Sequence, residues 1–177
     1  MKKLHPYFKE EQRFNQLWLK LILYGSTLAA LGPLYYGTIM QIGNGQPWGN
    51  KPISNTGLLI MDLLITLLMA GILYLVFGTK LITIIKPDGI HIIFKPFLIK
   101  EKIIEPHTIE SYEVKKYKPV ADYGGWGVKQ GRKGKVYNAN GNIGLQLLLK
   151  GNKRLLIGTQ RPEAIKRAME KLMNNNG

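Results

Sequence analysis

Residues 17–40 read LWLKLILYGSTLAALGPLYYGTIM, and residues 57–77 read GLLIMDLLITLLMAGILYLVF. Each stretch contains a single charged residue, Lys20 in the first and Asp62 in the second. About 20 apolar residues form a helix long enough to cross the hydrocarbon core of a bilayer. Two core helices of a soluble protein are the alternative, but such helices are rarely apolar on every face over this length. The two stretches therefore predict a transmembrane helical hairpin.

The charge of the chain lies on either side of this hairpin. Residues 1–20 carry a net charge of +3 and residues 80–177 carry +11, whereas residues 21–79 carry none. Lys and Arg next to membrane spans stay on the cytoplasmic side. We therefore expect both termini in the cytoplasm. The loop over residues 41–56, in which Lys51 is the only charged residue, is expected outside.

The spans are predicted over residues 17–40 and 57–79. Residues 1–16 precede them and combine aromatic residues such as Phe8 and Phe14 with basic ones. This composition predicts an amphipathic lead-in that lies at the cytoplasmic interface of the membrane. Simple flanking residues without a separate role are the alternative.

Two features inside the spans suggest contacts between helices. Gly25, Ala29 and Gly32 share one face of the first span, and small residues at this spacing let another helix approach closely. Asp62 lies in the second span, where a carboxylate marks a proton path or a partner helix. A simpler role is also open for Asp62, a hydrogen bond to a tyrosine or to the loop near the outer end of the span.

After residue 78 the continuous hydrophobicity gives way to short alternating runs, which predict strands. We expect about seven of them, over residues 81–85, 90–94, 98–104, 109–117, 136–138, 144–150 and 154–158. A helix follows, because Pro162 suits a first helical position. Its apolar stripe consists of Ile165, Ala168, Met169 and Leu172. The fold class is therefore α+β, with a β-barrel or bent sandwich over residues 80–177 and a C-terminal helix that caps one open end.

A glycine-rich basic loop interrupts the strands. Trp126 lies in the run Gly-Gly-Trp-Gly, where glycine permits positive φ and close backbone approach. This tryptophan either forms a platform for a ligand or plugs one end of the barrel. The basic residues of the loop either gather an anionic lipid headgroup or a partner, or form a solvated face: Lys129, Arg132, Lys133 and Lys135.

Enzyme chemistry has little support in the sequence. The chain has no cysteine, and its three histidines show no metal-ligand spacing. Nucleophile-elbow and phosphate-loop motifs are absent from the sequence. We therefore expect no catalytic residues, no metal and no cofactor. Nucleic-acid binding would suit the charge, but tethering at a membrane explains the charge more economically.

The order of hairpin, strands and capping helix resembles the bacterial pleckstrin-homology-like membrane proteins, in particular a small family of Bacteroidetes-type bacteria. The segments that carry the resemblance are SYEV (111–114), DYGGWGVK (122–129), GKVYN (134–138), GNIGLQL (141–147) and IGTQRPE (157–163). The resemblance implies a pleckstrin-homology-like domain and a place in the bacterial inner membrane. It brings no catalytic residues to carry over.

These observations predict a non-enzymatic, membrane-anchored binding or scaffold module, whose basic cytoplasmic domain contacts anionic lipid or a protein partner. The alternative is a subunit of a membrane complex, assembled through its transmembrane helices with another membrane protein or with further copies of itself. An enzyme is the weakest of the three classes.

Overall fold

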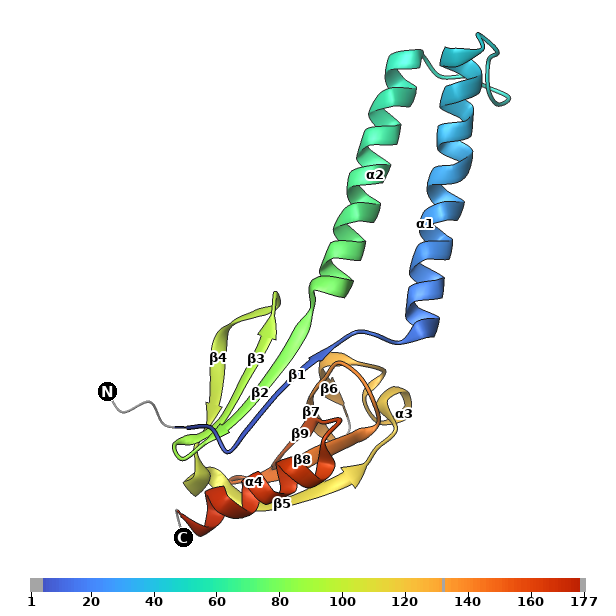
Figure 1. Cartoon of the computed structure of the whole chain (residues 1–177). Helices are drawn as coiled ribbons and strands as arrows, with labels where there is room; N and C mark the ends of the chain where they lie inside the picture. Colours follow the sequence, from blue (N-terminus) through green and yellow to red (C-terminus); the bar gives the residue numbers. More distant parts are fainter. Residues whose placement is uncertain (1–4, 132, 176–177) are drawn as a thin grey trace. The chain divides into compact units, whose positions relative to one another are not determined.

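The computed structural model describes residues 5–131 and 133–175, without the side chains of Leu98 and Ile99. The chain forms two compact units (Figure 1). One is the hairpin of residues 15–77, and the other is a domain built from residues up to 14 together with residues from 78 onward. The domain is therefore assembled from chain segments on both sides of the hairpin.

The hairpin consists of α1 (Leu17–Thr38), which a π-helical turn (Ile39–Gly43) continues, and α2 (Asn55–Gly78). Both helices are long and apolar enough to cross a membrane, and only 6% of the most apolar window of each is buried. A core helix of a soluble protein would have most of its surface covered. The two predicted apolar helices are confirmed, although the helical turns continue past residue 40 and α2 begins before residue 57.

The first sheet contains four strands in the order β1 (Phe8–Arg13), β2 (Lys80–Lys86), β3 (Gly89–Lys95) and β4 (Leu98–Ile104). β1 is antiparallel to β2, with Arg13 opposite Lys80 and Phe8 opposite Ile85. The predicted lead-in over residues 1–16 is therefore wrong for residues 8–13, which complete this sheet. Exposed residues (Lys9, Glu11, Arg13) alternate with buried ones (Phe8, Glu10, Gln12) at the period of a strand that has one face toward a core.

The second sheet contains five strands in the order β5 (Ile109–Lys116), β8 (Ile143–Leu149), β9 (Lys153–Gly158), β7 (Gly134–Asn138) and β6 (Gly127–Gly131). A 3₁₀ turn (Pro106–Thr108) precedes β5, and the short helix α3 (Pro119–Tyr123) precedes β6. β7 and β9 are parallel, whereas the other paired strands are antiparallel. The described residues thus form nine strands rather than about seven, because β1 and β6 were not predicted.

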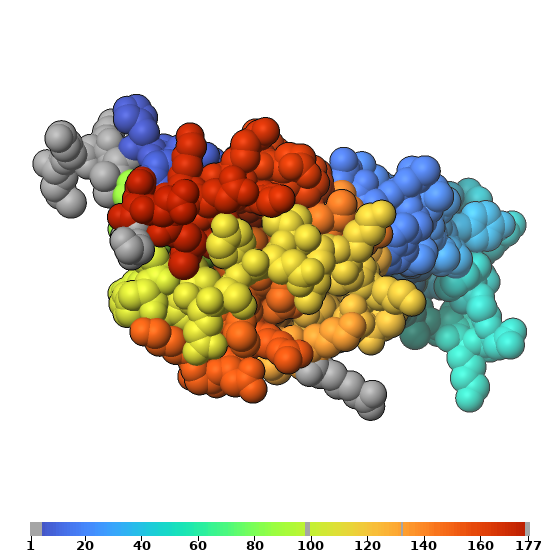
Figure 2. Space-filling view, turned by 90° about the horizontal axis from the view of Figure 1, so that it is seen from below, coloured from blue at the N-terminus to red at the C-terminus, as the bar shows by residue number. Residues whose placement is uncertain are grey.

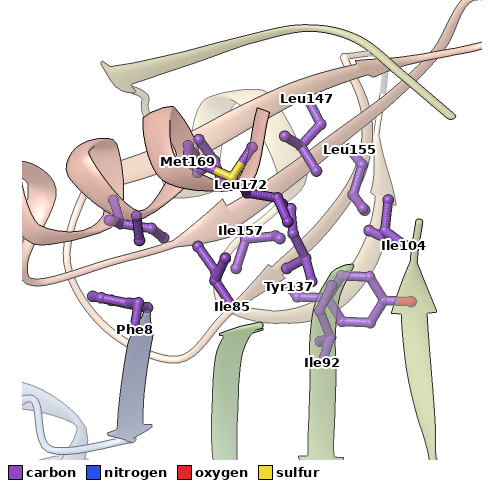
Figure 3. Close-up of a cluster of buried hydrophobic side chains, with 14 of the residues drawn as sticks. Phe8, Ile85, Ile92, Ile104, Tyr137, Leu147, Leu155, Ile157, Met169 and Leu172 are labelled. Atoms are coloured by element: carbon purple, nitrogen blue, oxygen red, sulfur yellow. The ribbon is translucent and has the colours of Figure 1, made fainter. Parts of the chain in front are cut away.

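The hydrophobic core of the domain lies between the two sheets and α4 (Pro162–Asn174). The predicted apolar stripe of the last helix is confirmed, since its four members are buried: Ile165, Ala168, Met169 and Leu172. Figure 3 shows Met169 and Leu172 beside Leu147 and Ile157 of the second sheet. Seen from below, α4 (red) lies beside β5 (yellow) (Figure 2). The helix therefore belongs to the core.

Polar side chains of β1 fix the strand to the segment that leads into α4. Both oxygens of the buried Glu10 carboxylate accept hydrogen bonds, from Thr159 Oγ1 at 2.6 Å and from the Gln160 backbone N–H at 2.7 Å. Gln12 Nε2 donates to the Gly158 carbonyl oxygen at 2.5 Å. The segment IGTQRPE thus has a structural role, because it binds β1, which precedes the hairpin in the chain, to the part of the domain that follows the hairpin.

Candidate functional site

A cavity of about 460 Å³ lies where β4 meets the β6–β7 turn and the β8–β9 turn. Among its described lining residues there are five basic side chains and no carboxylate: Lys102, Lys133, Lys135, Lys153 and Arg154. Gln130 and Asn152 add neutral polar groups. The chain thus gathers cations from three strands, β4, β7 and β9, and from the β6–β7 turn in one cavity.

Two glycines permit the close packing that forms this cavity. A Cβ atom at Gly131 would lie 2.6 Å from the Asp122 carbonyl oxygen, so the end of β6 packs directly on α3. Gly134 has a φ of +107°, and a Cβ atom there would collide with the carbonyl oxygen of Arg154. Only glycine adopts such a φ without strain. The β6–β7 turn is therefore held against both α3 and β9.

One cation of the cavity is paired, and the others are not. Lys133 Nζ lies 2.8 Å from Asp122 Oδ1. This hydrogen bond, together with that from the Lys118 backbone N–H, lowers the pKa of the Asp122 carboxyl below its usual value of 3.8. Within the part of the chain that the structure describes, the other four cations have no carboxylate within 4 Å. The cavity therefore keeps a net charge of about +4.

Aromatic contact positions two of the lysines. The Nζ atoms of Lys102 and Lys135 lie 5.8 and 5.3 Å from the centre of the Tyr137 ring. The Tyr137 side chain is fully buried, so the position of the ring is fixed by the surrounding core. A cation over an aromatic face is attracted by the ring quadrupole. Both ammonium groups therefore lie within about 6 Å of the centre of one ring, although they come from different sheets.

The structure separates the residues that the sequence grouped in the basic loop. Lys133 and Lys135 line the cavity, whereas Lys129 Nζ donates to the Gly124 carbonyl oxygen at 2.9 Å and does not line it. Arg132 lies outside the described residues. Trp126 is half-buried, and its Nε1 donates to the Gly141 carbonyl oxygen at 3.0 Å. This bond ties together two turns, and whether Trp126 also contacts a ligand stays a prediction.

The expected use of glycine around this tryptophan is confirmed, because Gly124, Gly125 and Gly127 have φ values of 72°, 117° and 120°. Sequence reasoning missed Lys102, Lys153 and Arg154. The Lys-Arg pair directly follows the Gly151-Asn152 turn, which was a usable signal for an exposed basic hairpin. Its position beside Lys135 depends on the parallel pairing of β7 with β9, which places Lys135 opposite Leu155.

A second group of cations lies at the end of the first sheet where the chain enters α1 and leaves α2. Arg13 is opposite Lys80, and Lys80 is opposite Lys95, so three basic residues stand side by side on neighbouring strands. Glu11 lies 2.6 Å from the Arg13 guanidinium and 3.8 Å from Lys80 Nζ. In the β3–β4 turn next to Lys95, the Phe97 side chain is 62% exposed.

In the hairpin, Asp62 connects the two helices. Its Oδ2 accepts a hydrogen bond of 2.5 Å from Thr38 Oγ1, and the carboxylate is buried. Tyr35 and Thr66 form a second bridge, with 2.6 Å between their hydroxyl oxygens. The simpler role is thus supported for Asp62, although its partner is a threonine of α1 rather than a tyrosine or the loop.

The small-residue face predicted on α1 is not used by the hairpin itself. No described atom beyond their own helix and chain neighbours lies within 4 Å of a Cβ atom built on Gly25 or Gly32, and Ala29 is exposed. The face is therefore open on the described hairpin, and its role in packing against another helix stays a prediction.

Neither His91 nor His107 is among the described residues that line the cavity. His91 is buried in β3, with Nδ1 2.9 Å from Glu101 Oε1 and Nε2 3.1 Å from Asp88 Oδ1. His107 is exposed beside Glu105. Among the described residues no group of three or more histidine and carboxylate side chains could hold a metal ion.

A comparison with curated proteins finds no match. A family model, by contrast, covers almost the whole chain, from the residues before β1 to the end of α4. Because the match spans residues 5–175, the chain belongs to the family of unknown function DUF6141.

Proposed function

We propose that the protein is a non-enzymatic, membrane-anchored binding module of the bacterial inner membrane, with both termini in the cytoplasm. Its basic domain lies against the anionic cytoplasmic leaflet and binds an anionic ligand or a protein partner there. The orientation is supported by the distribution of charge, because the basic residues flank the apolar helices while the loop between the helices carries only Lys51.

One observation carries the contact with the leaflet. The row of Arg13, Lys80 and Lys95 lies at the end of the sheet from which both helices continue. If α1 and α2 span a bilayer, the short connections, residues 14–16 before α1 and residue 79 after α2, keep this row near its surface. Each Lys or Arg near an anionic leaflet contributes about 1 kcal/mol. The exposed ring of Phe97 beside Lys95 suits the interfacial region, where aromatic side chains are favoured.

The domain has several features of a pleckstrin-homology-like fold. A four-stranded antiparallel sheet faces a second sheet, and a C-terminal helix packs into the core. The parallel pairing of β7 with β9 and the contribution of β1 are features that the sequence did not predict. We propose the fold relationship on this arrangement.

Site-directed fluorescence tests the contact with the leaflet. The chain has no cysteine, so a single introduced one carries an environment-sensitive probe without competition. The test position is Phe97→Cys and the control is His107→Cys, which follows β4 at the opposite end of the same sheet. In full-length protein in nanodiscs, we expect a blue-shifted emission at position 97 with anionic lipid, less shift with neutral lipid, and none at position 107.

Charge variants complete this test. Lys80→Glu combined with Lys95→Glu should abolish the shift at position 97. The pair Lys166→Glu and Arg167→Glu, on the exposed face of α4, should leave the shift unchanged. A probe at position 97 that stays as exposed to water as the probe at position 107 would refute the contact. Labelling of Lys51→Cys from outside intact cells, without labelling at position 107, tests the orientation.

The alternative function is assembly of a membrane complex through α1. It is favoured by the open face of Gly25, Ala29 and Gly32, which the hairpin does not fill. Small residues let helix backbones approach closely in a bilayer.

A further inference from the structure

We propose that the cavity between β4, the β6–β7 turn and the β8–β9 turn binds a compact ligand that carries two adjacent phosphate groups. This site shares no residue with the row of Arg13, Lys80 and Lys95. It therefore adds a specific ligand site to the proposed function and does not depend on contact with the leaflet.

Charge balance indicates two phosphates rather than one. Among the described residues five cations line the cavity, and the carboxylate of Asp122 neutralises one of them. A phosphate monoester carries about −1.5 to −2 charges near neutral pH. Two such groups match the remaining charge of about +4, whereas a single carboxylate or a single phosphate would leave cations uncompensated in a concave site.

The shape and the donors of the cavity fit the same ligand. A volume of about 460 Å³ is within the range of small-molecule sites, which runs from about 300 to 1,000 Å³. Arg154 supplies a planar guanidinium that binds phosphate with two parallel hydrogen bonds, and the lysines act as point charges around it. Gln130 and Asn152 supply neutral donors at the two turns.

The arrangement of the lysines favours a binding site over a solvated surface. On a solvated face, like charges spread apart to lower their repulsion. Here Lys102 of β4 and Lys135 of β7 instead lie near the same Tyr137 ring, although they come from different sheets. Gly134 lets the β6–β7 turn approach the backbone of Arg154, so that the turn with Lys133 lies next to the β9 strand. Cations from both sheets thereby line one cavity, where a single anionic ligand can contact them.

The test uses full-length protein in nanodiscs of neutral phosphatidylcholine, with inorganic pyrophosphate as the probe and calorimetry as the measurement. We expect saturable binding of pyrophosphate, with a Kd at least tenfold lower than that of inorganic phosphate. The double variant Lys153→Ala/Arg154→Ala should weaken the binding of pyrophosphate at least tenfold. Both residues are exposed, so their loss leaves the core of the domain intact.

A matched control removes the same two charges elsewhere. Lys166 and Arg167 form another adjacent Lys-Arg pair, on the exposed face of α4, and Lys166→Ala/Arg167→Ala should change the Kd less than twofold. A third variant predicts a gain of affinity that no folding defect imitates. Asp122→Asn releases Lys133 from its ion pair while it keeps an oxygen for the Lys118 backbone N–H, so pyrophosphate should bind severalfold more tightly.

Failure to bind pyrophosphate at millimolar concentration would overturn the proposal, as would an equal loss of affinity in the two double variants. The source of the phosphates is decided by repeating the titration with bilayers of equal charge. A polyprenyl diphosphate, which carries two adjacent phosphates on a lipid chain, competes with pyrophosphate if a lipid fills the site, whereas phosphatidylglycerol does not. An unchanged Kd in both bilayers assigns the site to a soluble ligand. Because the first titration uses neutral lipid, its outcome is independent of the leaflet contact.

Discussion

Replacing Phe8 by alanine tests whether the strand before the hairpin belongs to the core of the domain. Phe8 is 4% exposed, and the guanidinium of Arg161 lies 5.5 Å from the centre of its ring. A buried phenylalanine removes about 150–250 Å² from water, and at about 25 cal/mol per Å² this corresponds to about 4–6 kcal/mol. Because β1 is an edge strand that can partly collapse on the gap, we expect a loss near the lower end of the Phe→Ala range, about 3 kcal/mol.

The measurement uses a domain without the hairpin. Arg13 and Lys80 are opposite each other, so Phe14 and Thr79 come next in register and an Asn-Gly turn can join them. Residues 5–14 linked in this way to residues 79–175 contain every strand of both sheets. Urea unfolding is followed by circular dichroism. With a slope of about 1.5 kcal/mol per molar urea, the expected loss lowers the midpoint by about 2 M.

Phe97→Ala is the matched control, because it deletes the same side chain at a position that is 62% exposed. Its expected effect is below about 1 kcal/mol, which corresponds to the loss of one tilted contact with the Phe94 ring at 6.4 Å. If Phe8→Ala shifts the midpoint no more than Phe97→Ala does, β1 contributes no core and the assembly of the domain across the hairpin is refuted. A second check is that residues 80–177 alone should fail to fold cooperatively.

Three further predictions concern β1, α1 and the acid side of the stability curve. Glu10→Gln should destabilise the domain without the hairpin by about 1–3 kcal/mol in urea unfolding, because an amide N–H then replaces one of the two accepting oxygens that face Thr159 and Gln160. An unchanged midpoint would show that the two hydrogen bonds to Glu10 do not stabilise the domain. If α1 assembles with another helix, Gly25→Leu with Gly32→Leu should abolish cross-linked oligomers in membranes, whereas the exposed control Ser26→Leu should not. Equal effects of the two variants would show that the face of Gly25 and Gly32 does not carry the assembly. Burial by itself would raise the pKa of the Asp88 carboxyl, but the hydrogen bond and the charge of His91 lower this pKa below its usual value of 3.8. The ionised carboxyl therefore stabilises the fold at pH values above the usual pKa, and this stabilisation is lost as the pH falls below it. The melting temperature of Asp88→Asn should accordingly fall less than that of the unchanged domain between about pH 5 and pH 3, and parallel curves would contradict this.

The strands show where sequence patterns are sufficient. The alternation that predicted strands near residues 81–85, 90–94 and 98–104 appears as β2, β3 and β4, because side chains with a period of two face one core and solvent in turn. β6 was missed because its sequence, GVKQG, has two glycines and a single apolar residue. It is a strand only because β7 offers a hydrogen-bonding edge beside it.

The candidate site shows the opposite case. Lys133 and Lys135 were accessible to sequence reasoning, because they lie in one glycine-rich loop that cannot serve as core. Lys102 and Arg154 lie more than 15 residues from that loop on either side, and although the turn before Lys153 and Arg154 indicates an exposed pair, nothing in the local pattern places either residue beside the loop. They reach the cavity through sheet order, which short-range periodicity does not record.

The sequence by itself determined the two apolar helices, the amphipathic last helix and the concentration of positive charge outside the hairpin. These features depend on the hydrophobicity of residues close together in the chain, and that property is local. Only the tertiary structure decided that residues 8–13 pair with β2 across the whole hairpin, and that β7 runs parallel to β9. Backbone hydrogen bonds between strands are the same for almost any side chain, so the choice of partner is made by the burial of a common core between both sheets and α4.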